Sequence, residues 1–404
     1  MAEKKIPRIR FEGFTEAWEQ CKLNDITDVR DGTHDSPKYF AEGHPFITSK
    51  NVKNGYLNFN DVQYISDADF DAINCRSKVD VNDILMGMIG TIGNIALVRK
   101  TPDFAIKNVA LIKDTGLVYP KYIYHFLESS SVENQLINSM DGGTQKFIAL
   151  NKVRELDVKV PNKKEQLLIG DFLEEIDSSI TLHQRKCEKL KMFKKSMLEK
   201  MFPKNGEKVP EVRFDGFTDD WEQCELAELG KIVTGSTPST DNKDYYCENG
   251  IPWVTPTDIS QNITFKTEKR LTSKGEKAGR VVPQDTVLVT CIASIGKNTM
   301  LGTKGSFNQQ INGLIPDKKV NYPYFLLTES NLWSAEMKKT AAAATMQIVN
   351  KNEFSIIETY IPELEEQIKI GEYFKTIDTS ITLHQRKVEK LQMIKKSMLD
   401  KMFV

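Results

Sequence analysis

Two stretches of the chain, residues 165–202 and 366–403, place apolar residues at alternating steps of four and three. Neither contains proline, each contains one glycine, and both are rich in residues that favour helix. A stripe repeated for about five heptads is typical of a coiled coil, and each helix should be about 55 Å long. The predicted seam consists of Ile169, Leu173, Ile176, Ile180, His183, Cys187 and Leu190 in the first stretch, and Ile370, Phe374, Ile377, Ile381, His384, Val388 and Leu391 in the second.

Charge along these stretches predicts how the two helices pair. The first half of 165–202 is acidic and its second half is basic, and 366–403 also ends basic. In a parallel pair the basic halves would lie side by side, whereas an antiparallel pair places the basic end of one helix beside the acidic start of the other. Single exposed ion pairs contribute little, but their sum favours an antiparallel pair. Pairing between two copies of the chain is the alternative, and two seam-bearing helices in one chain make the intramolecular pair less costly.

Polar residues on the seam have two interpretations. His183 and His384 fall near the middle of each helix, where they either fix the register, as buried polar residues do in coiled coils, or form a pH-sensitive or metal-binding pair. We favour the first. Lys194 and Lys395 are expected where the chain leaves the two-helix contact, so that they meet solvent or a partner.

The chain also repeats itself over longer distances. Residues 165–202 and 366–403 are identical at 26 of 38 positions, and the segment 7–15 recurs as 210–218. Each copy of the shorter segment is followed by Trp-Glu-Gln-Cys. The blocks between these segments, about 22–160 and 225–361, resemble each other only faintly. Two similar scaffolds therefore carry two domains that differ in detail.

This layout predicts an α/β (α+β) protein with two mixed domains separated by two long helices. The predicted boundaries are 1–160 for the first domain with its N-terminal segment 1–21, 161–202 for the first helix, 203–361 for the second domain with its linker 203–224, and 362–404 for the second helix.

Composition narrows the class of protein. No apolar run approaches the roughly 18 residues that span a bilayer, and the start of the chain has no apolar stretch of a signal peptide. The six cysteines form no CxxC pair, so we expect neither a zinc site nor a disulfide framework, and a reducing cytoplasm fits best. The net charge of -1 does not exclude DNA binding, which needs only a local basic surface.

Several segments, taken in their order along the chain, resemble a known family. They include 31–39 (DGTHDSPKY), 48–51 (TSKN), 234–239 (TGSTPS), 251–253 (IPW), 295–297 (IGK) and 307–312 (FNQQIN), together with the Glu-Gln that opens each helix after a proline. No single segment is decisive, but the ordered set is similar to the specificity (S) subunit of type I restriction-modification enzymes, over essentially the whole chain.

The resemblance implies that each variable block is a target recognition domain that reads one half of a split sequence in double-stranded DNA. It also implies two methyltransferase (M) subunits docked on the helices and domains, and two restriction (R) subunits that join for cleavage. S-adenosylmethionine, ATP and Mg are then expected in those partners, with no cofactor, metal or catalytic residue in this chain and no membrane association.

Near-identical antiparallel helices have an approximate twofold axis. Two-fold protein symmetry matches inverted half-sites on duplex DNA, and because the two domains differ, the target should be bipartite and asymmetric. Inserting about four residues into 165–202 should then change the gap between half-sites by one or two base pairs.

Polar loop residues are the candidates for contact with DNA. Amides, hydroxyls and His suit base edges, and lysines suit phosphates. The alternative is ordinary turn chemistry, since Gly, Asn, Thr and Ser populate loops regardless of function. The repeated aromatics Phe11, Phe14 and Trp18 and their counterparts Phe214, Phe217 and Trp221 are predicted to anchor the domains to the helices rather than to stack on nucleotides. The DNA-binding candidates are Thr33, His34, Lys50, Asn51, Lys107, Asn108, Thr144, Gln145 and Lys146 in the first domain, and Ser236, Thr237, Thr257, Lys297, Asn308, Gln309, Gln310, Thr345 and Gln347 in the second.

Two other classes of function are alternatives to DNA reading. An enzyme is disfavoured because the sequence has no GxxxxGK[ST] loop, no GxGxxG run and no Asn/Asp-Pro-Pro-aromatic motif. The second alternative is a coiled-coil adaptor that displays two protein-binding domains and reads no DNA. Salt separates these hypotheses, because a DNA reader loses affinity steeply as salt rises.

Overall fold

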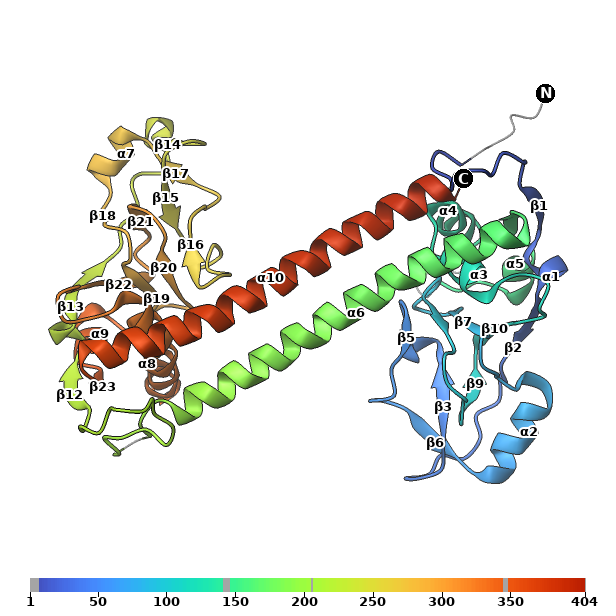
Figure 1. Ribbon diagram of the computed structural model, residues 1–404, viewed down its shortest axis with the longest axis horizontal. Helices are drawn as coiled ribbons and strands as arrows, with labels where there is room; N and C mark the ends of the chain where they lie inside the picture. Colours follow the sequence, from blue (N-terminus) through green and yellow to red (C-terminus); the bar gives the residue numbers. More distant parts are fainter. Residues whose placement is uncertain (1–6, 141–145, 205, 344–347, 404) are drawn as a thin grey trace. The chain divides into compact units, whose positions relative to one another are not determined.

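The computed structural model describes residues 7–140, 146–204, 206–343 and 348–403. Contacts divide the chain into two compact units, residues 1–184 with 386–404 and residues 185–385. Each unit is a mixed α/β domain packed on one half of each long helix, α6 (Lys163–Lys200) and α10 (Leu364–Met402) (Figure 1). The predicted α/β class with two long helices is therefore confirmed. No helix of the described residues has the length and apolar character needed to cross a membrane.

The first unit contains a four-stranded antiparallel sheet of order β2-β10-β7-β8, a three-stranded sheet of order β6-β3-β9, and the ribbons β1-β11 and β4-β5. Strands β3 and β9 are parallel. The strands are β1 (Glu19–Lys22), β2 (Asp28–Asp31), β3 (His44–Thr48), β4 (Val52–Lys53), β5 (Tyr56–Leu57), β6 (Gln63–Ile65), β7 (Ile84–Gly87), β8 (Ile95–Leu97), β9 (Ala105–Lys107), β10 (Val109–Lys113) and β11 (Asp157–Val160). The helices are α1 (Leu23–Ile26), η1 (Ser49–Asn51), α2 (Asp67–Ser77), α3 (Pro120–Leu127), α4 (Ser130–Asn138) and α5 (Leu150–Arg154).

The second unit repeats this topology with longer sheets. Its order β13-β22-β19-β20-β16 extends the first sheet of the other unit by one strand, and β14-β17-β15-β21-β18 contains the second. Strands β15 and β21 are again parallel. The strands are β12 (Glu222–Glu225), β13 (Gly230–Thr234), β14 (Tyr246–Cys247), β15 (Ile251–Val254), β16 (Ile263–Thr264), β17 (Arg270–Leu271), β18 (Val281–Val282), β19 (Val287–Thr290), β20 (Asn298–Leu301), β21 (Gly305–Phe307), β22 (Ile311–Pro316) and β23 (Glu358–Ile361). The helices are η2 (Leu226–Glu228), η3 (Lys243–Tyr245), α7 (Ser273–Ala278), α8 (Pro323–Ala343) and α9 (Lys351–Ser355).

The central strands of each unit are apolar on both faces because they separate two cores. In β7, Ile84 and Met86 enter the core that includes the long helices, while Leu85 enters a second core beneath the other sheet. In β19, Val287 and Leu288 alternate in the same way. Side chains of a strand point alternately to opposite faces, so a continuous apolar run lets one strand serve both cores.

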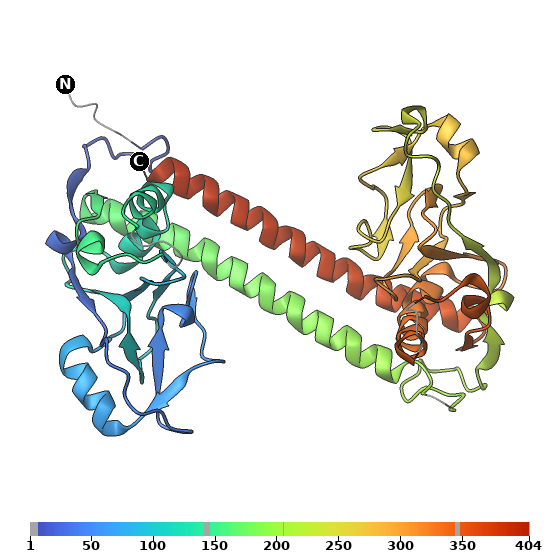
Figure 2. The ribbon, with the colours of Figure 1, turned by 180° about the vertical axis from the view of Figure 1, so that it is seen from behind.

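The helix seam is buried as the apolar pattern predicts. In the first unit, Ile169, Leu173, Ile176 and Ile180 are at most 8% exposed, and in the second unit the same holds for Ile370, Phe374, Ile377 and Ile381. Cys187 is buried, and His183, Leu190, His384, Val388 and Leu391 are half-buried. The two helices pack as the predicted intramolecular antiparallel coiled coil, seen from both sides in Figures 1 and 2.

Two seam lysines correct an expectation from the sequence. Lys194 Nζ lies 2.6 Å from Asp378 Oδ1, and Lys395 Nζ lies 2.7 Å from Asp177 Oδ2. Both lysine side chains are less than one-fifth exposed, so they do not meet solvent or a partner. A step of 17 residues forward along α6, from Asp177 to Lys194, matches a step of 17 backward along α10, as an antiparallel register requires.

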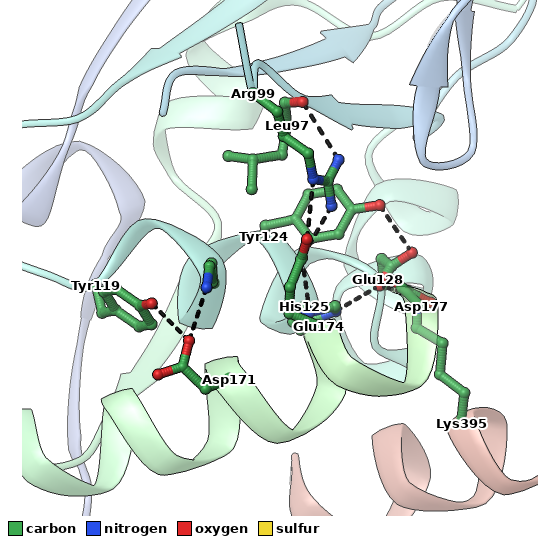
Figure 3. Close-up of polar contacts among 11 residues, drawn as sticks. Leu97, Arg99, Tyr119, Tyr124, His125, Glu128, Asp171, Glu174, Asp177 and Lys395 are labelled. Atoms are coloured by element: carbon green, nitrogen blue, oxygen red, sulfur yellow. Dashed lines mark hydrogen bonds and ion pairs between the residues drawn. The ribbon is translucent and has the colours of Figure 1, made fainter. Parts of the chain in front are cut away.

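Lys395 also joins α10 to a buried polar cluster in the first unit (Figure 3). Its Nζ is 2.7 Å from Glu128 Oε2 as well as from Asp177. The fully buried His125 places Nδ1 2.9 Å from the same carboxylate. Burial raises the pKa of Asp177; for Glu128 burial is opposed by the contacts of His125 and Lys395, and its pKa falls. His125, Glu128 and Asp177 could together ligate a cation, but the ammonium group of Lys395 already supplies the positive charge.

The N-terminal segment of each repeat is fastened to the start of its own helix. Arg10 forms a two-pronged hydrogen bond to the fully buried Glu165, through Nε at 2.6 Å and a terminal nitrogen at 2.8 Å. Arg213 holds Glu366 with nearly the same distances. Bidentate pairs of this kind fix orientation as well as charge.

The repeated aromatics pack in the role predicted for them. Phe11 contacts Phe172 and Phe214 contacts Tyr373, each with ring centroids 6.0 Å apart. Trp18 packs against Tyr122 and Phe403, and Trp221 is fully buried against Phe202. Phe11, Trp18, Phe214 and Trp221 therefore join each domain to the helices, as the sequence predicts. Lys369 of α10 places Nζ 4.5 Å from the ring centroid of Phe217, and the anchoring role of Phe14 stays a prediction.

A buried carboxyl in the second unit predicts pH-dependent stability. Glu329 of α8 accepts a hydrogen bond from Thr359 at Oε1, and its Oε2 has no partner among the described residues. Burial raises the pKa of Glu329 to about 8, although the Thr359 contact opposes the shift. The folded state therefore retains a proton that the unfolded chain releases near pH 4.5, so stability is full below that pH and falls as pH rises through 8.

We expect Glu329→Gln to match the parent chain in melting temperature at pH 4 and to melt at a higher temperature at pH 9. At pH 9 its free energy of unfolding should be larger by on the order of a few kcal/mol. Glu336→Gln, at an exposed position of the same helix, is the control and should show no such gain. Parallel melting profiles for the parent and Glu329→Gln across this range would contradict the account.

Candidate nucleic-acid interface

In each unit, four loops meet at one edge of the paired sheets. In the first unit they are residues 31–35, 48–51, 88–94 and 107–108; in the second they are 234–238, 255–258, 291–297 and 308–310. We call each set the four-loop edge. The second, third and fourth loops of each set follow equivalent strands, β3 and β15, β7 and β19, β9 and β21, which explains why segments distant in sequence gather there.

The first loop is forced close to the fourth by a glycine. A Cβ on Gly32 would lie 2.4 Å from the carbonyl oxygen of Ile106, and one on Gly235 would lie 2.1 Å from that of Asn308. Only glycine permits this approach. The next residue then donates its backbone N–H across the gap, Thr33 to Ile106 at 3.1 Å and Ser236 to Phe307 at 2.8 Å.

The second loop is the same side-chain-capped turn in both units. The backbone N–H and hydroxyl of Thr48 donate to Asn51 Oδ1 at 3.0 and 2.9 Å. The same groups of Thr255 donate to Asp258 Oδ2 at 2.8 and 2.6 Å. Asn and Asp stabilise such turns by mimicking a backbone acceptor, so Asn51 acts here as a structural residue: it is 3% exposed, and its Nδ2 donates to two carbonyl oxygens.

The third loop also has one backbone course in both units. Gly90 and Ala293 have φ of 72° and 61°, and Gly93 and Gly296 have φ of 81° and 78°. Positive φ is costly for alanine, yet Ala293 adopts the backbone conformation that Gly90 adopts in the first unit. Isolated bridges pair Ile89 with Phe147 and Ile292 with Ile348. The segment before α5 in the first unit and the segment before α9 in the second therefore reach the edge at the same place.

The units differ in how tightly the loops are joined. In the first, the Ser49 hydroxyl donates to the Asn108 carbonyl at 2.6 Å and accepts from the N–H of Met88 at 3.1 Å, which binds three loops together. In the second, Pro256 stands at the place of Ser49 and has no hydroxyl to do so. A pocket of about 560 Å³ opens there, and its lining includes Trp253, Thr257 and Gln310.

Both four-loop edges lie in regions of the chain that match one family of domains. The model of the type I restriction modification DNA specificity domain matches the chain twice, over residues 15–192 and 218–393. This chain belongs to that family. Each match includes one complete four-loop edge and most of one long helix.

Relatives and solved structures of this specificity family extend over most or all of the chain. The chain is 21% identical to the putative type I restriction enzyme MjaX specificity subunit of Methanocaldococcus jannaschii, over 98% of this chain and 95% of that protein. It is 23% identical to the HindI specificity subunit of Haemophilus influenzae, over 68% and 76%. The fold is similar to the type I S subunit from M. genitalium, with a TM-score of 0.71, 14% identity and 99% of both chains covered.

The specificity-family fold brings most of the predicted residues of the first unit to its edge. Thr33 forms the first loop, and the exposed His34 faces Asn108 across it, with Nδ1 2.7 Å from Oδ1. Lys107 donates to Ser36, and the exposed Lys50 pairs with Asp61 at 3.0 Å. Lys146 is exposed beside the third loop, while Thr144 and Gln145 lie outside the described residues.

The second unit presents its candidates in the same way. Thr237 donates to Gln309, both being exposed, in the place that His34 and Asn108 take in the first unit. Thr257 and Lys297 are exposed. Asn308 is 8% exposed and donates to Gln310 Oε1 at 2.9 Å, so its amide supports the loop. Ser236 accepts from the N–H of Arg280 at 2.8 Å; Thr345 and Gln347 lie outside the described residues.

Two arginines of the edges were missed by the sequence reasoning. Arg76 of α2 pairs with Asp31, whose other oxygen is 2.9 Å from His34 Nε2. Arg280 is exposed and donates to the carbonyl of Thr234. Both lie outside the polar loop segments from which candidates were drawn, and only the fold brings them to these loops.

A thiol at the start of the third loop is inert: burial raises the pKa of Cys291 to about 11.

Proposed function

We propose that this chain is the DNA-recognition subunit of a type I restriction-modification complex, that it reads a bipartite and asymmetric duplex target, and that it catalyses no reaction itself. The observation that carries the proposal is the four-loop edge, built twice in one chain on equivalent strands but with different exposed side chains. Residues 1–160 and 203–361 are the two target recognition domains, and residues 161–202 and 362–404 form the spacer.

Within each edge we assign roles by exposure and chemistry. Lys50, Lys107, Lys146 and Lys297 bind phosphates, because lysine offers a mobile positive charge that suits the DNA backbone. The exposed amides and hydroxyls face the base edges. Asn51 and Asn308 hold their loops in shape instead of contacting bases, because their side chains are buried and engaged.

We propose two M subunits and two R subunits as partners, with S-adenosylmethionine, ATP and Mg bound by those subunits. Exposed apolar residues at equivalent positions of both helices support two identical partners: Leu182 and Leu383 are 52% and 60% exposed, and Met192 and Met393 are 66% and 65% exposed. A matching solved structure of 17% identity and TM-score 0.53 concerns complex assembly of the type I R-M system.

The test is long-read methylation mapping of cells that express this chain with its cognate M subunit. We expect one motif with two unlike half-sites separated by a fixed gap of unread bases. A contiguous motif, or methylation unrelated to sequence in a complex that forms, would contradict the proposal. Affinity of the complex for the mapped duplex should also fall steeply with salt, whereas an adaptor would show neither the motif nor the salt dependence.

A further inference from the structure

One pair of side chains occupies equivalent places in the two edges. His34 and Asn108 face each other between the first and fourth loops of the first unit, and Thr237 and Gln309 do so in the second. In each pair the residue on the fourth loop is an amide, and its side-chain oxygen is held by the residue on the first loop. The strand before each amide is held alike, with the N–H of Thr33 donating to Ile106 and that of Ser236 to Phe307. The following strand is reached one residue later in the second unit, because Gly32 donates to Val109 whereas Gly235 donates to Ile311. The loop that carries Gln309 is therefore one residue longer than the loop that carries Asn108.

The side-chain amides of Asn108 and Gln309 are available to bind a base, because among the described residues neither forms a hydrogen bond to a backbone atom. Asn51 donates to two carbonyl oxygens and Asn308 Oδ1 accepts from the backbone N–H of residue 310, whereas the Gln309 side chain contacts only Thr237 in the hydrogen bonds of the described residues. An amide oxygen has two lone pairs and an amide nitrogen two hydrogens. With one lone pair used by Thr237, Gln309 still offers one acceptor and a donor.

That remaining donor and acceptor set matches one base. Adenine presents N7 as acceptor and N6–H as donor in the major groove, and Asn and Gln bind this edge with two hydrogen bonds. The lysines around each edge supply charge for phosphates but cannot make this selection. An amide whose orientation is already fixed by a hydrogen bond also loses less conformational entropy on binding than a mobile one.

We propose that Asn108 and Gln309 are equivalent adenine-reading residues, one for each half-site, and that His34 and Thr237 are positioning residues that hold the amides ready. The inference rests on the proposed function and adds the base and the side chain that reads it. Each half-site then contains one adenine that is recognised by a single side-chain amide.

The first experiment uses the unaltered complex of this chain with its M subunit. Duplexes of the mapped motif carry 7-deazaadenine, which lacks the N7 acceptor, at one adenine at a time. In each half-site one substitution should weaken binding by about tenfold, because one of two base contacts is lost. If no adenine of either half-site is sensitive, the inference is overturned, while a wild-type complex that still prefers the split motif leaves the proposed function standing.

Variants then assign each sensitive adenine to a side chain. Gln309→Met keeps length but removes the amide, and Asn108→Gly removes the amide at a backbone φ of 51° that glycine accepts readily. Gln309→Met should abolish the 7-deaza effect in one half-site only, and Asn108→Gly in the other only. In methylation maps the same A·T position should become degenerate, with the gap unchanged.

The matched control is Gln223→Met. Gln223 is an exposed amide on β12 whose Oε1 also accepts from a hydroxyl, that of Tyr360 at 3.4 Å, but it lies outside the four-loop edge. This variant should keep the wild-type motif. Degeneracy at a G·C position, or equal changes in both half-sites from one variant, would overturn the assignment.

The positioning role has its own signature. Thr237→Val removes the hydroxyl and keeps the shape of the side chain, so discrimination at the Gln309 adenine should fall severalfold while binding to the other half-site stays unchanged. Thr237→Ser restores a hydroxyl and should restore discrimination. If Thr237→Val reads the adenine as sharply as the parent chain does, Thr237 does not position Gln309.

Discussion

Lengthening both long helices by three heptads should lengthen the gap between the half-sites by about nine base pairs and leave both half-sites unchanged. Twenty-one residues inserted after Gln184 and again after Gln385 add about 31 Å to each helix, close to one turn of B-DNA at 34–36 Å. Whole heptads keep the seam in phase, and the nearly whole turn returns both half-sites to the same face of the duplex.

These insertion points are chosen from the contacts of the helices. The chain divides between its two units at Gln184 and at Gln385. The pairs Asp177–Lys395 and Lys194–Asp378 each lie within one unit, so both survive the double insertion. Inserting the same 21 residues into α6 alone is the control. The inserted residues then have no partner on α10, and sequence-specific methylation should be lost. A doubly extended chain that methylates with the original gap would show that the helices do not set the spacing.

The scaffold could be predicted from the sequence because its signals are local and periodic. The seam residues Ile169, Leu173 and Ile176 stand out at a spacing that only a helix satisfies, and they are buried as expected. The antiparallel direction of the two helices followed from the distribution of charge along each of them, which can be read without knowing which residues face each other. The anchoring role of Trp221 followed from an aromatic repeated beside each helix.

Other features depend on register or on the tertiary fold and could not be read in this way. Lys194 and Lys395 were expected to meet solvent or a partner, because lysine on an apolar stripe usually signals its end; the acids opposite them are identified only once the register is known. Asn51 and Asn308 carry the chemistry of base-reading residues, but burial assigns them to turns. Arg76 joins the edge through a helix that lies 45 residues from its partner Asp31.

The shared four-loop edge was visible in part before the fold was known. Short matches such as Pro45-Phe46 with Pro252-Trp253 mark equivalent strands, and Gly93 and Gly296 mark the same turn with positive φ. The pairing of His34 with Asn108 was not visible, since 74 residues separate them. Side-chain pairs across loops require the topology, which faint sequence likeness does not fix.

The two domains should be interchangeable on their helices, because equivalent helix residues receive them. Tyr119 donates its backbone N–H to Gln166 at 2.8 Å, and Tyr322 donates to Gln367 at 2.9 Å. Gly170 and Gly371 each lie against these tyrosines, with no room for a Cβ. A copy of residues 225–361 should therefore seat in place of residues 22–160.

That replacement tests the central claim, that one chain carries two independent readers on antiparallel helices. Methylation mapping of cells with the cognate M subunit should return a symmetric target: the second domain's half-site twice, as an inverted repeat with the original gap. The parent chain, mapped alongside, supplies both half-sites and the gap. A direct repeat, or a first half-site that persists after its domain is gone, would contradict the account.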